Sequence, residues 1–595
     1  MKGKVYETEV RPAKLYGIET VPMTKRQEAE LEVAELKMLR LSLRVTRLDR
    51  IRNEHIKGTA HVRRFGDKAR EPLLPSRGSG TTVNWRSVGS GDCWTGEIAL
   101  AFSCQGCYYS GARILFPLYF LSLSSFRMSS GTNPCVLGMD IGTTSVKCCL
   151  VDTITKEVVS SQKKDTCSNV PSELGTEGNK QDVPRILSAL QMCVSRLPRE
   201  GMKRVVRVGV SGQMHGCMLW KAGHSWEQKP DSDRYAINEV SNMYTWQDSR
   251  CTQEFLASLP TPQSHLAVSS GYGCATLIWF SKHKPELLSR YDRAGTIHDF
   301  LVCMLCGLDQ PVMSLHNAAS WGFFNTVTKE WNREVLAGAG LPLNLLPKVV
   351  ESGQTAGYIP NTWYSIPANT PVLASLGDLQ CSVLPLLSKN TDAVINISTS
   401  AQLCFKMPPE YTPAEEPPSI PQPIEYVPFF DGSYLAVAAS LNGGNALAAF
   451  VRTIQQWSLD IGFQVPQSKI WQRILELGGN PESSSSLIIR PTLFGERHSP
   501  EENASATNVD LGTLSLGKMT RALCKGVITN LHSMMPRSLL EENEITSMIG
   551  GGSALVRNPI LLKELEEAYQ MTVALDTRGD AAYGSALAAI NAAIA

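Results

Sequence analysis

A hydroxyl-rich turn between two apolar runs is the first stretch of this chain suited to chemistry. Residues 136–152 have the sequence VLGMDIGTTSVKCCLVD, and the apolar run before the turn ends in Asp140. The residues of the turn and its exit are Gly142, Thr143, Thr144, Ser145 and Lys147. Backbone N–H groups in a tight turn form an anion-binding concavity, which hydroxyls and a lysine strengthen for phosphate. The pattern predicts a β-hairpin whose tip binds phosphate, or else an ordinary polar hairpin. Asp140 is placed to hold Mg²⁺ through water.

Two polar stretches further along the chain have the residue types of a sugar pocket. The buried run 205–210 leads into a glycine-bounded loop that carries Gln213, Met214 and His215. Loops that follow strands in α/β folds commonly carry ligand contacts, although a lone histidine is often purely structural. In the cluster 244–250, Trp246 can cover the apolar face of a polyol while Asp248 accepts its hydroxyls. The alternative for that cluster is a surface tryptophan beside an Asp–Arg ion pair.

A third candidate is the carboxylate of Asp378, which follows the strand-like run 372–376 and Gly377. A carboxylate in that place can accept the proton of an attacking hydroxyl. It can equally cap the helix that follows, and both roles are compatible.

The hydroxyl-rich hairpin pattern occurs a second time. Residues 393–397 form an apolar run, Thr399 lies at the centre of a Ser-Thr-Ser turn, and residues 403–405 are again apolar. This repetition predicts an internal structural duplication, with a second domain beginning near residue 384.

A run of glycines near the C-terminus suggests close contact between backbone and ligand. The predicted strand 545–549 is followed by Gly550, Gly551, Gly552 and Ser553. Consecutive glycines allow phosphates or a flat ligand to lie against the backbone, whereas a merely flexible turn is the alternative. Asn558, which begins the next helix, lies within reach of an adenosine in this interpretation.

Helices and strands that alternate along the chain must position these residues. Asp182 and Pro184 predict the start of a helix whose apolar residues recur at helical spacing through Leu197. A long amphipathic helix is predicted over 516–534 and a helix of small residues over 581–595.

Composition sets limits on the class of protein. The 595 residues exceed what one core accommodates, and 57 basic against 56 acidic residues give no bulk attraction to nucleic acid or membrane. The 16 cysteines show no framework spacing, which favours reduced thiols in a cytoplasmic enzyme. The apolar run 113–123 is too short to span a bilayer.

The predicted organisation has three parts. Residues 1–133 form a poorly structured extension, of which 1–127 are expected to be dispensable and the product of a misplaced start codon. Residues 134–383 form a domain with the sugar and phosphate sites, and residues 384–595 form a domain with the nucleotide site. Neither a Walker motif nor a dinucleotide fingerprint is present. ATP binding through hairpin turns and a glycine triplet is the actin-like, or ribonuclease H-like, way of holding a nucleotide between two lobes.

Several motifs together resemble the FGGY carbohydrate kinases, in order over about residues 134–595. They are DIGTTSVK (140–147), SGQMHG (211–216), TWQDSR (245–250), GDLQ (377–380), NISTSAQ (396–402) and GGGSALVRNP (550–559). The departures are Ser398, where many relatives have glycine, and the N-terminal extension.

The resemblance implies an α/β, actin-like two-domain ATPase fold with the active site in the interdomain cleft. It implies ATP-dependent phosphorylation of a primary hydroxyl, with sedoheptulose as the expected sugar and Mg²⁺ as cofactor. The family's catalytic base falls on Asp378 and its metal-linked acid on Asp140. Sugar contacts fall on residues 213–215, Trp246 and Asp248, and nucleotide contacts fall on residues 143–147, Thr399 and 551–553.

Three alternatives remain open at this stage. The nearest is another sugar kinase of the family, acting on xylulose or glycerol. The second is a sugar-binding regulator that kept the fold without the chemistry, which intact Asp140 and Asp378 disfavour. The third is an actin-like or chaperone-type ATPase with protein partners, which the polar pockets disfavour.

Overall fold

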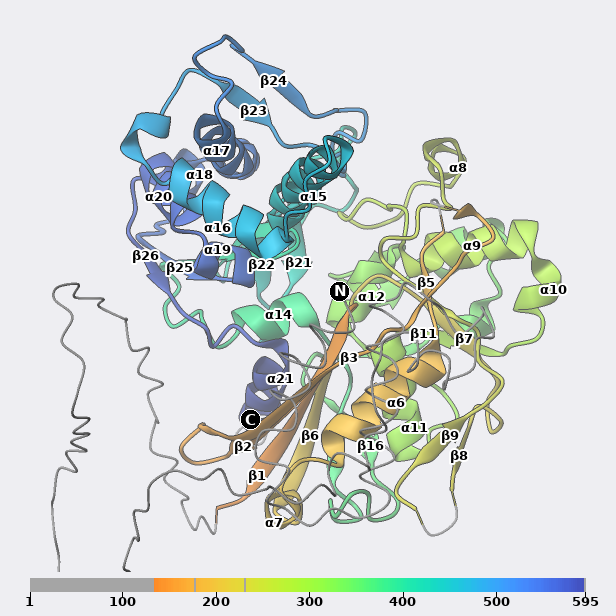
Figure 1. Cartoon of the computed structure of the whole chain (residues 1–595). Helices are drawn as coiled ribbons and strands as arrows, with labels where there is room; N and C mark the ends of the chain where they lie inside the picture. Colours follow the sequence, from red (N-terminus) through yellow and green to blue (C-terminus); the bar gives the residue numbers. More distant parts are fainter. Residues whose placement is uncertain (1–132, 176–177, 230–231, 593–595) are drawn as a thin grey trace, which may run out of the picture. The chain divides into compact units, whose positions relative to one another are not determined.

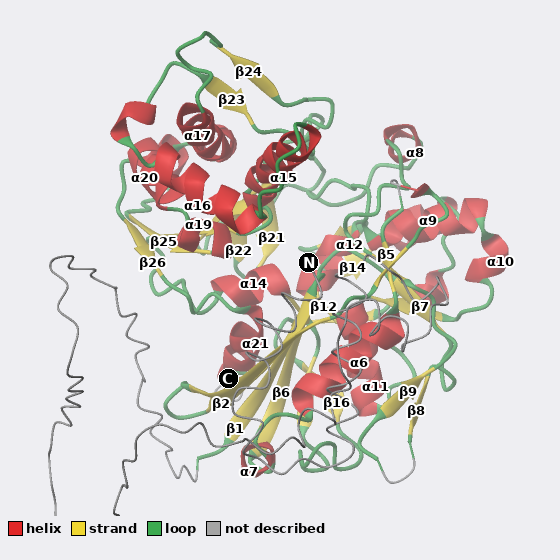
Figure 2. Ribbon diagram, viewed as in Figure 1, coloured by secondary structure: helices red, strands yellow, loops and turns green. Residues whose placement is uncertain are grey.

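The computed structural model describes residues 133–175, 178–229 and 232–592. These residues belong to one compact unit, Leu123–Ala595. The predicted extension, including the proposed start-codon artefact, lies outside the described residues except for Asn133. Two mixed β-sheets with helices against them organise the described chain (Figure 1, Figure 2). In the described ranges, we find no helix with the length and apolar character needed to cross a bilayer.

The first sheet is built around two parallel strands. Its order is β16-β17-β6-β1-β2-β3, with the short β18 also paired to β6. Strand β1 runs antiparallel to β2 and parallel to β6, and Asp140 lies opposite Ser211 in that parallel pair. Its strands are β1 (Cys135–Ile141), β2 (Ser145–Asp152), β3 (Val158–Asp165), β6 (Val205–Gly212), β16 (Thr355–Tyr358), β17 (Pro371–Leu373) and β18 (Leu376–Gly377).

The second sheet repeats the central part of this pattern. Its order is β21-β22-β20-β19-β25-β26, and β19 runs antiparallel to β20 and parallel to β25. Each sheet therefore has an antiparallel hairpin whose first strand is also parallel to a later strand. Its strands are β19 (Asp392–Ile397), β20 (Ala401–Lys406), β21 (Ile424–Pro428), β22 (Tyr434–Ser440), β25 (Ser547–Gly551) and β26 (Val573–Leu575).

Helices cover both faces of the first sheet. Helices α6 (Val183–Val194) and α11 (Ile297–Cys306) share one apolar core with Leu137 and Met139 of β1. Helix α21 (Ala581–Asn591) packs on the other face, against Val136. This division follows from the alternation of side chains along a strand.

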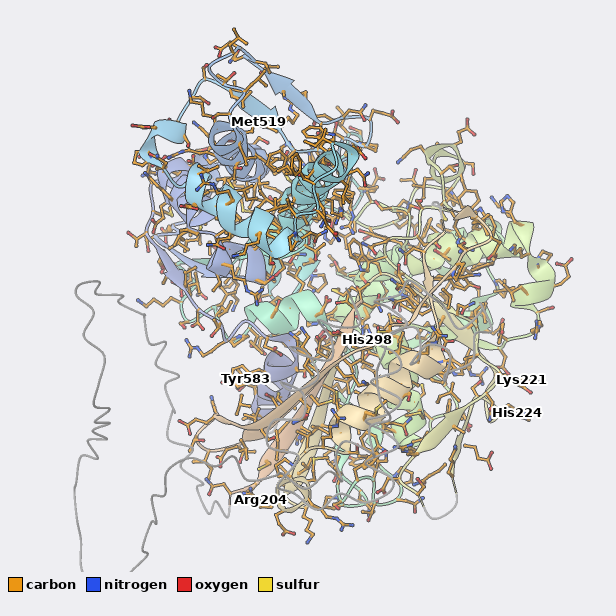
Figure 3. The ribbon with its side chains drawn as sticks, viewed as in Figure 1. Arg204, Lys221, His224, His298, Met519 and Tyr583 are labelled. Carbon is orange, nitrogen blue, oxygen red and sulfur yellow. The ribbon has the colours of Figure 1, made fainter. Side chains whose placement is uncertain are left out.

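The C-terminal helix approaches the first sheet unusually closely. A Cβ on Gly138 would lie 2.0 Å from the backbone oxygen of Ala582, and one on Gly209 would lie 2.1 Å from that of Ser585. Tyr583, labelled in Figure 3, donates its hydroxyl hydrogen to the backbone oxygen of Lys156 over 2.9 Å. The expected domain boundary near residue 384 stays a prediction. The packing of α21 shows that the C-terminal part of the described chain returns to the first sheet.

Helix α14 (Asp378–Val383) lies where the two halves meet. Its Cys381 and Val383 share an apolar cluster with Val394 of β19 and Ala581 of α21. The helix therefore contacts the second sheet directly and contacts α21, which covers the first sheet. Its first residue, Asp378, lies between the two sheets.

Most predicted elements have the expected positions. Helix α6 begins after Asp182, whose side chain accepts from the backbone N–H of Arg185, and helix α17 spans Leu516–Met534. The prediction that a strand ends at Ile549 is wrong. Strand β25 continues through Gly550 and Gly551 because both pair with β19.

The remaining elements surround these two sheets. In the first half they are β4 (Asn169–Val170), β5 (Lys180–Gln181), α7 (Arg199–Met202), β7 (Met218–Trp220), β8 (Trp226–Gln228), β9 (Tyr235–Ile237), β10 (Met243–Tyr244), α8 (Gln253–Ala257), α9 (Gly273–His283), α10 (Pro285–Leu288), β11 (Arg293–Gly295), β12 (Val312–Ser314), α12 (Leu315–Trp321), β13 (Phe324–Asn325), β14 (Glu330–Trp331), α13 (Arg333–Gly338), η4 (Leu343–Leu345) and β15 (Lys348–Val350). In the second half they are α15 (Gly444–Asp460), α16 (Gln467–Gly478), η5 (Pro481–Ser483), β23 (Ile488–Arg490), β24 (Ser505–Thr507), α18 (Arg537–Glu542), α19 (Ser553–Arg557) and α20 (Pro559–Tyr569).

Candidate active site

A cleft of about 690 Å³ brings together residues from both halves of the chain. It contains members of each stretch that the sequence indicated as functional. The predicted residues among its lining are Asp140, Thr143, Lys147, Met214, His215, Trp246, Asp378, Thr399, Gly552 and Ser553. A cleft that combines apolar walls with a few convergent polar groups is the usual form of a small-molecule site.

Asp378 lies in this cleft at the start of α14, directly after β18. One carboxylate oxygen accepts from the backbone N–H of Leu379 over 2.8 Å. Burial, together with the negative charge of Asp140, raises the pKa of Asp378 to about 7. A carboxyl group with that pKa can exchange a proton near neutral pH, as a general base must.

Asp140 is the second carboxylate of the cleft and lies at the end of β1. Its Oδ1 accepts from the hydroxyl of Ser211 over 3.4 Å. Burial is the main reason that the pKa of Asp140 rises to about 6, and nearby Lys147 partly offsets it. Because the charge of Asp140 also disfavours ionisation of Asp378, a cation near them would stabilise the charged forms.

The donor set of this cleft fits Mg²⁺ that arrives with a nucleotide. Among the described residues, no group of three or more His, Cys, Asp or Glu side chains is gathered to hold a metal alone. Mg²⁺ at phosphate sites commonly uses one or two carboxylates, with waters and phosphate oxygens as its other ligands. Asp140 supplies one such carboxylate in the cleft.

The tip of the first hairpin is directly bonded to the predicted sugar loops. The indole Nε1 of Trp246 donates to the hydroxyl of Thr143 over 3.0 Å, and that hydroxyl donates to Oε1 of Gln213 over 3.4 Å. Gln213 is buried and therefore holds Thr143 from behind, outside the cleft lining. The phosphate-type turn and the sugar-type loops are thus one connected unit.

His215 presents a neutral imidazole to the cleft. Its Nδ1 lies 2.9 Å from the backbone oxygen of Ser320, and because a carbonyl only accepts, Nδ1 carries the hydrogen. Burial lowers the pKa of His215 to about 3. The ring stacks on Tyr272 at a centroid distance of 4.5 Å. Nε2 therefore has a lone pair with which it can accept from a hydroxyl.

The second hairpin tip meets the glycine triplet. The hydroxyl of Ser398 accepts from the backbone N–H of Ser553 over 3.2 Å. Gly552 has φ +93°, and a Cβ there would lie 2.3 Å from the backbone oxygen of Ile397. Gly552 therefore lets α19 begin against the tip, where Ser398, Thr399 and Ser553 line the cleft.

Lys147 has a partner within the described chain. Its ammonium group lies 3.0 Å from a carboxylate oxygen of Asp580, which also caps α21. Both residues line the cleft. Lys147 is thus available to phosphate while Asp580 holds it in place.

Four predicted nucleotide contacts lie outside this lining. Thr144 is exposed within the tip, Ser145 is buried at the start of β2, and Gly551 belongs to strand β25. Asn558 is buried, and its Oδ1 accepts from the backbone N–H of Ile560 at the start of α20. We assign Asn558 a capping role in place of the predicted adenosine contact.

Asp248 also has a different role from the predicted one. Its Oδ1 accepts from Nε of Arg250 over 2.6 Å, and its Oδ2 accepts from the backbone N–H of Asn179 and from Nη2 of Arg250. Both side chains of this pair are almost completely buried. Asp248 thus has no free acceptor for a sugar hydroxyl. The Asp–Arg ion pair that was the alternative prediction is present, but it lies in the protein core and not on the surface.

Sequence reasoning missed several residues of the cleft. Tyr272, Glu425, Arg497 and Asp580 line it. The sequence around Asp580 has the same pattern as Gly377-Asp378, a glycine and an aspartate before a helix, and that signal was available. Tyr272 and Glu425 lie in stretches with no local pattern, and only folding brings them to the site.

Comparisons with known proteins agree with this geometry. Residues 135–385 match the sequence profile described as the FGGY family of carbohydrate kinases, N-terminal domain. The chain is 45% identical over 464 residues to the sedoheptulokinase of Homo sapiens, covering 76% of this chain and 97% of the relative. It is 23% identical over 447 residues to the xylulose kinase of Escherichia coli, covering 70% and 82%.

Solved structures support the fold class. A xylulose kinase from Rhodospirillum rubrum superposes with a TM-score of 0.62 at 17% identity, covering 76% of this chain and 89% of that one. A glycerol kinase from Plasmodium falciparum, solved with ADP, gives a TM-score of 0.60 at 15% identity and covers 78% and 90%. These likenesses confirm the predicted fold class, the α/β fold of the actin-like sugar kinases.

Proposed function

Because this chain belongs to the FGGY family of carbohydrate kinases, we propose that it transfers the γ-phosphoryl group of ATP to the primary hydroxyl at C7 of sedoheptulose. The products are sedoheptulose 7-phosphate and ADP. The observation that carries this proposal is the shared cleft of Asp378, the sugar loop at His215 and two hydroxyl-rich hairpin tips. The 45% identity to two sedoheptulokinases supports the choice of sugar. A cytoplasmic location stays a prediction.

Phosphoryl transfer requires mainly positioning and compensation of charge. Asp378 accepts the proton of the attacking C7 hydroxyl. Its position at the junction of the two halves allows it to face a phosphate held between the hairpin tips. When bound, Mg²⁺ would neutralise phosphate charge, and Asp140 is the carboxylate that would hold it.

The remaining residues orient the two substrates. Trp246 covers an apolar face of the sugar, and Nε2 of His215 accepts from one of its hydroxyls. Lys147 and the backbone N–H of Thr143 bind phosphate oxygens from one side, and the hydroxyls of Thr399 and Ser553 bind them from the other. A site enclosed on both sides also limits water, which otherwise competes as the acceptor.

The rate should depend on pH through the ionisation of Asp378. Because a base acts only when it is deprotonated, kcat/KM should rise with pH and level off above the pKa of about 7. Replacing Asp140 with asparagine removes the charge that raises this pKa, so the acid limb should move to lower pH. Rates measured from pH 5 to 9 with both proteins test this. An unchanged midpoint in Asp140→Asn would contradict the coupling of the two carboxylates.

A sugar panel tests the proposed function. ADP release is measured with purified protein and MgATP in the presence of sedoheptulose, D-xylulose or glycerol, or with no sugar. We expect the highest kcat/KM with sedoheptulose and phosphorus at C7 in the NMR spectrum of the product. Preference for xylulose or glycerol would reassign the substrate. ATP hydrolysis that no sugar stimulates would refute the kinase assignment.

A further inference from the structure

The cleft continues past His215 to a wall that carries two opposite charges. Tyr272 from the first half and Glu425 and Arg497 from the second half line this wall. Glu425 belongs to strand β21, and Arg497 lies in the connection between β23 and β24. The mechanism above assigns no task to either charged residue.

A row of contacts leads from the catalytic carboxylate to this wall. A Cβ on Gly377, the neighbour of Asp378, would lie 2.6 Å from the sulfur of Met214. His215 follows Met214 in the chain and stacks on Tyr272. Besides burial, the charges of Glu425 and Arg497 shift the pKa of Tyr272 in opposite directions, and Arg497 adds to the effect of burial in lowering the pKa of His215. The charged pair is therefore at the end of the row opposite Asp378.

Arg497 is presented by a firmly held turn. The preceding residue, Glu496, is buried, and one of its oxygens accepts from the hydroxyl of Ser440 over 2.6 Å and from the side-chain amides of Asn442 and Asn530. Its other oxygen accepts from the backbone N–H of Leu441 over 2.9 Å. Glu496 thus fixes the turn, and Arg497 follows it and lines the cleft. No carboxylate of the described residues forms an ion pair with Arg497. Such preorganisation lowers the entropic cost of binding.

Glu425 is held where the two halves touch. Nε2 of His265 donates to the backbone oxygen of Tyr426, the next residue of β21, over 2.6 Å. The hydroxyl of Tyr434 on the adjacent strand donates to that of Thr326 over 3.0 Å. Because these bonds join the second sheet to the first half, the wall keeps its position relative to His215.

The chemistry of the pair matches a hydroxyl-bearing chain end. A guanidinium only donates hydrogen bonds, an ionised carboxylate only accepts them, and a hydroxyl does both. We propose that Arg497 and Glu425 bind the hydroxymethyl group at C1 of the sugar, the end remote from the phosphorylated hydroxyl. This inference rests on the proposed function and deepens it. A ketose two carbons shorter, with its reacting hydroxyl at Asp378, would leave both charges without a ligand, so the pair selects for chain length.

The test compares two sugars with two proteins. Values of kcat/KM are measured for sedoheptulose and for 1-deoxysedoheptulose, which lacks the C1 hydroxyl, with the wild type and with Arg497→Leu. We expect the wild type to lose about 10- to 100-fold on the deoxy sugar. Arg497→Leu should lose a similar factor with sedoheptulose but little more with the deoxy sugar, because each change removes the same contact. Equal penalties of Arg497→Leu on both sugars, or equal use of both sugars by the wild type, would overturn the proposal.

Controls separate this result from other failures. Arg473→Leu removes an exposed arginine of α16 that pairs with Glu476, and it should leave both sugars unaffected. Thermal melting reports folding, and if Arg497→Leu does not fold, the nearly isosteric Glu425→Gln is run through the same comparison. Absence of sedoheptulose turnover in the wild type would refute the proposed function and this inference with it. Turnover without the expected coupling would refute this inference alone.

Discussion

Replacing Asp378 with asparagine is expected to lower kcat by about 10³- to 10⁴-fold while ATP still binds. The substitution keeps the size of the side chain and an oxygen that can accept from the N–H of Leu379, but it removes the group that takes the proton. The hairpin tips that face phosphate remain intact. Steady-state kinetics with sedoheptulose and calorimetric titration with ATP measure the two effects separately.

A matched variant shows whether the loss comes from chemistry or from the helix. Asp182 likewise lies at the start of a helix, as the N-cap of α6, and its side chain accepts from the backbone N–H of Arg185, but it does not line the cleft. Asp182→Asn changes the same type of residue in a comparable position, so it should retain normal turnover. A near-normal rate in Asp378→Asn would remove Asp378 from its role as base.

Replacing Asp248 with asparagine is expected to lower the free energy of unfolding by about 3–5 kcal/mol, because it leaves a buried guanidinium without its counter-charge. Arg250 lies over the rings of Tyr244 and Phe280, 4.5 Å and 4.8 Å from their centroids, and its side chain is only 1% exposed. Denaturant unfolding followed by tryptophan fluorescence measures the loss. The substitution should also displace Trp246, two residues earlier, and weaken its hydrogen bond to Thr143. KM for the sugar should therefore rise as well.

The chain contains a control with the same spacing. Asp576 pairs with Arg578 over 2.7 Å, but 65% of the Arg578 side chain is exposed. Exposed ion pairs contribute about 0–1 kcal/mol, so Asp576→Asn should change stability little. If both variants lost the same free energy of unfolding, burial would not be the reason that the Asp248–Arg250 pair stabilises the fold.

Local patterns were sufficient to predict most elements and a carboxylate, Asp378, that lies in the cleft. The helix after Asp182 has an acidic cap and an early proline, and those signals act within one turn. Each of the two hairpins combines apolar runs with a polar tip. In both, the two strands pair antiparallel without a shift of register. Asp378 could be found because a glycine and a carboxylate after a strand form a local pattern.

The errors arose where distant residues decide the outcome. Whether Asp248 faces a sugar or a core depends on Asn179 and on the aromatic rings around Arg250. Strand β25 includes its glycines because β19 supplies partners from far along the chain. An adenosine contact was predicted for Asn558 because an asparagine at the start of a helix can either cap the helix or contact a ligand, and the local sequence is the same in both cases.

The C-terminal helix shows the same limit. Its small residues predicted a helix, but its partner, the first sheet, begins more than four hundred residues earlier. Gly138 and Gly209 make the approach of that helix possible, and neither is near it in sequence. Likewise, Arg497 and Glu425 join the cleft only through the packing of the second half.

A crystal structure of Asp378→Asn with ATP, Mg²⁺ and sedoheptulose tests the central claim most directly. The measurement is the distance from the side chain of residue 378 to the C7 hydroxyl oxygen, with the γ-phosphate in view. We expect about 3 Å, with that oxygen directed at the γ-phosphorus between the two hairpin tips. A sugar bound away from residue 378, or one that presents another hydroxyl to the phosphate, would contradict this account.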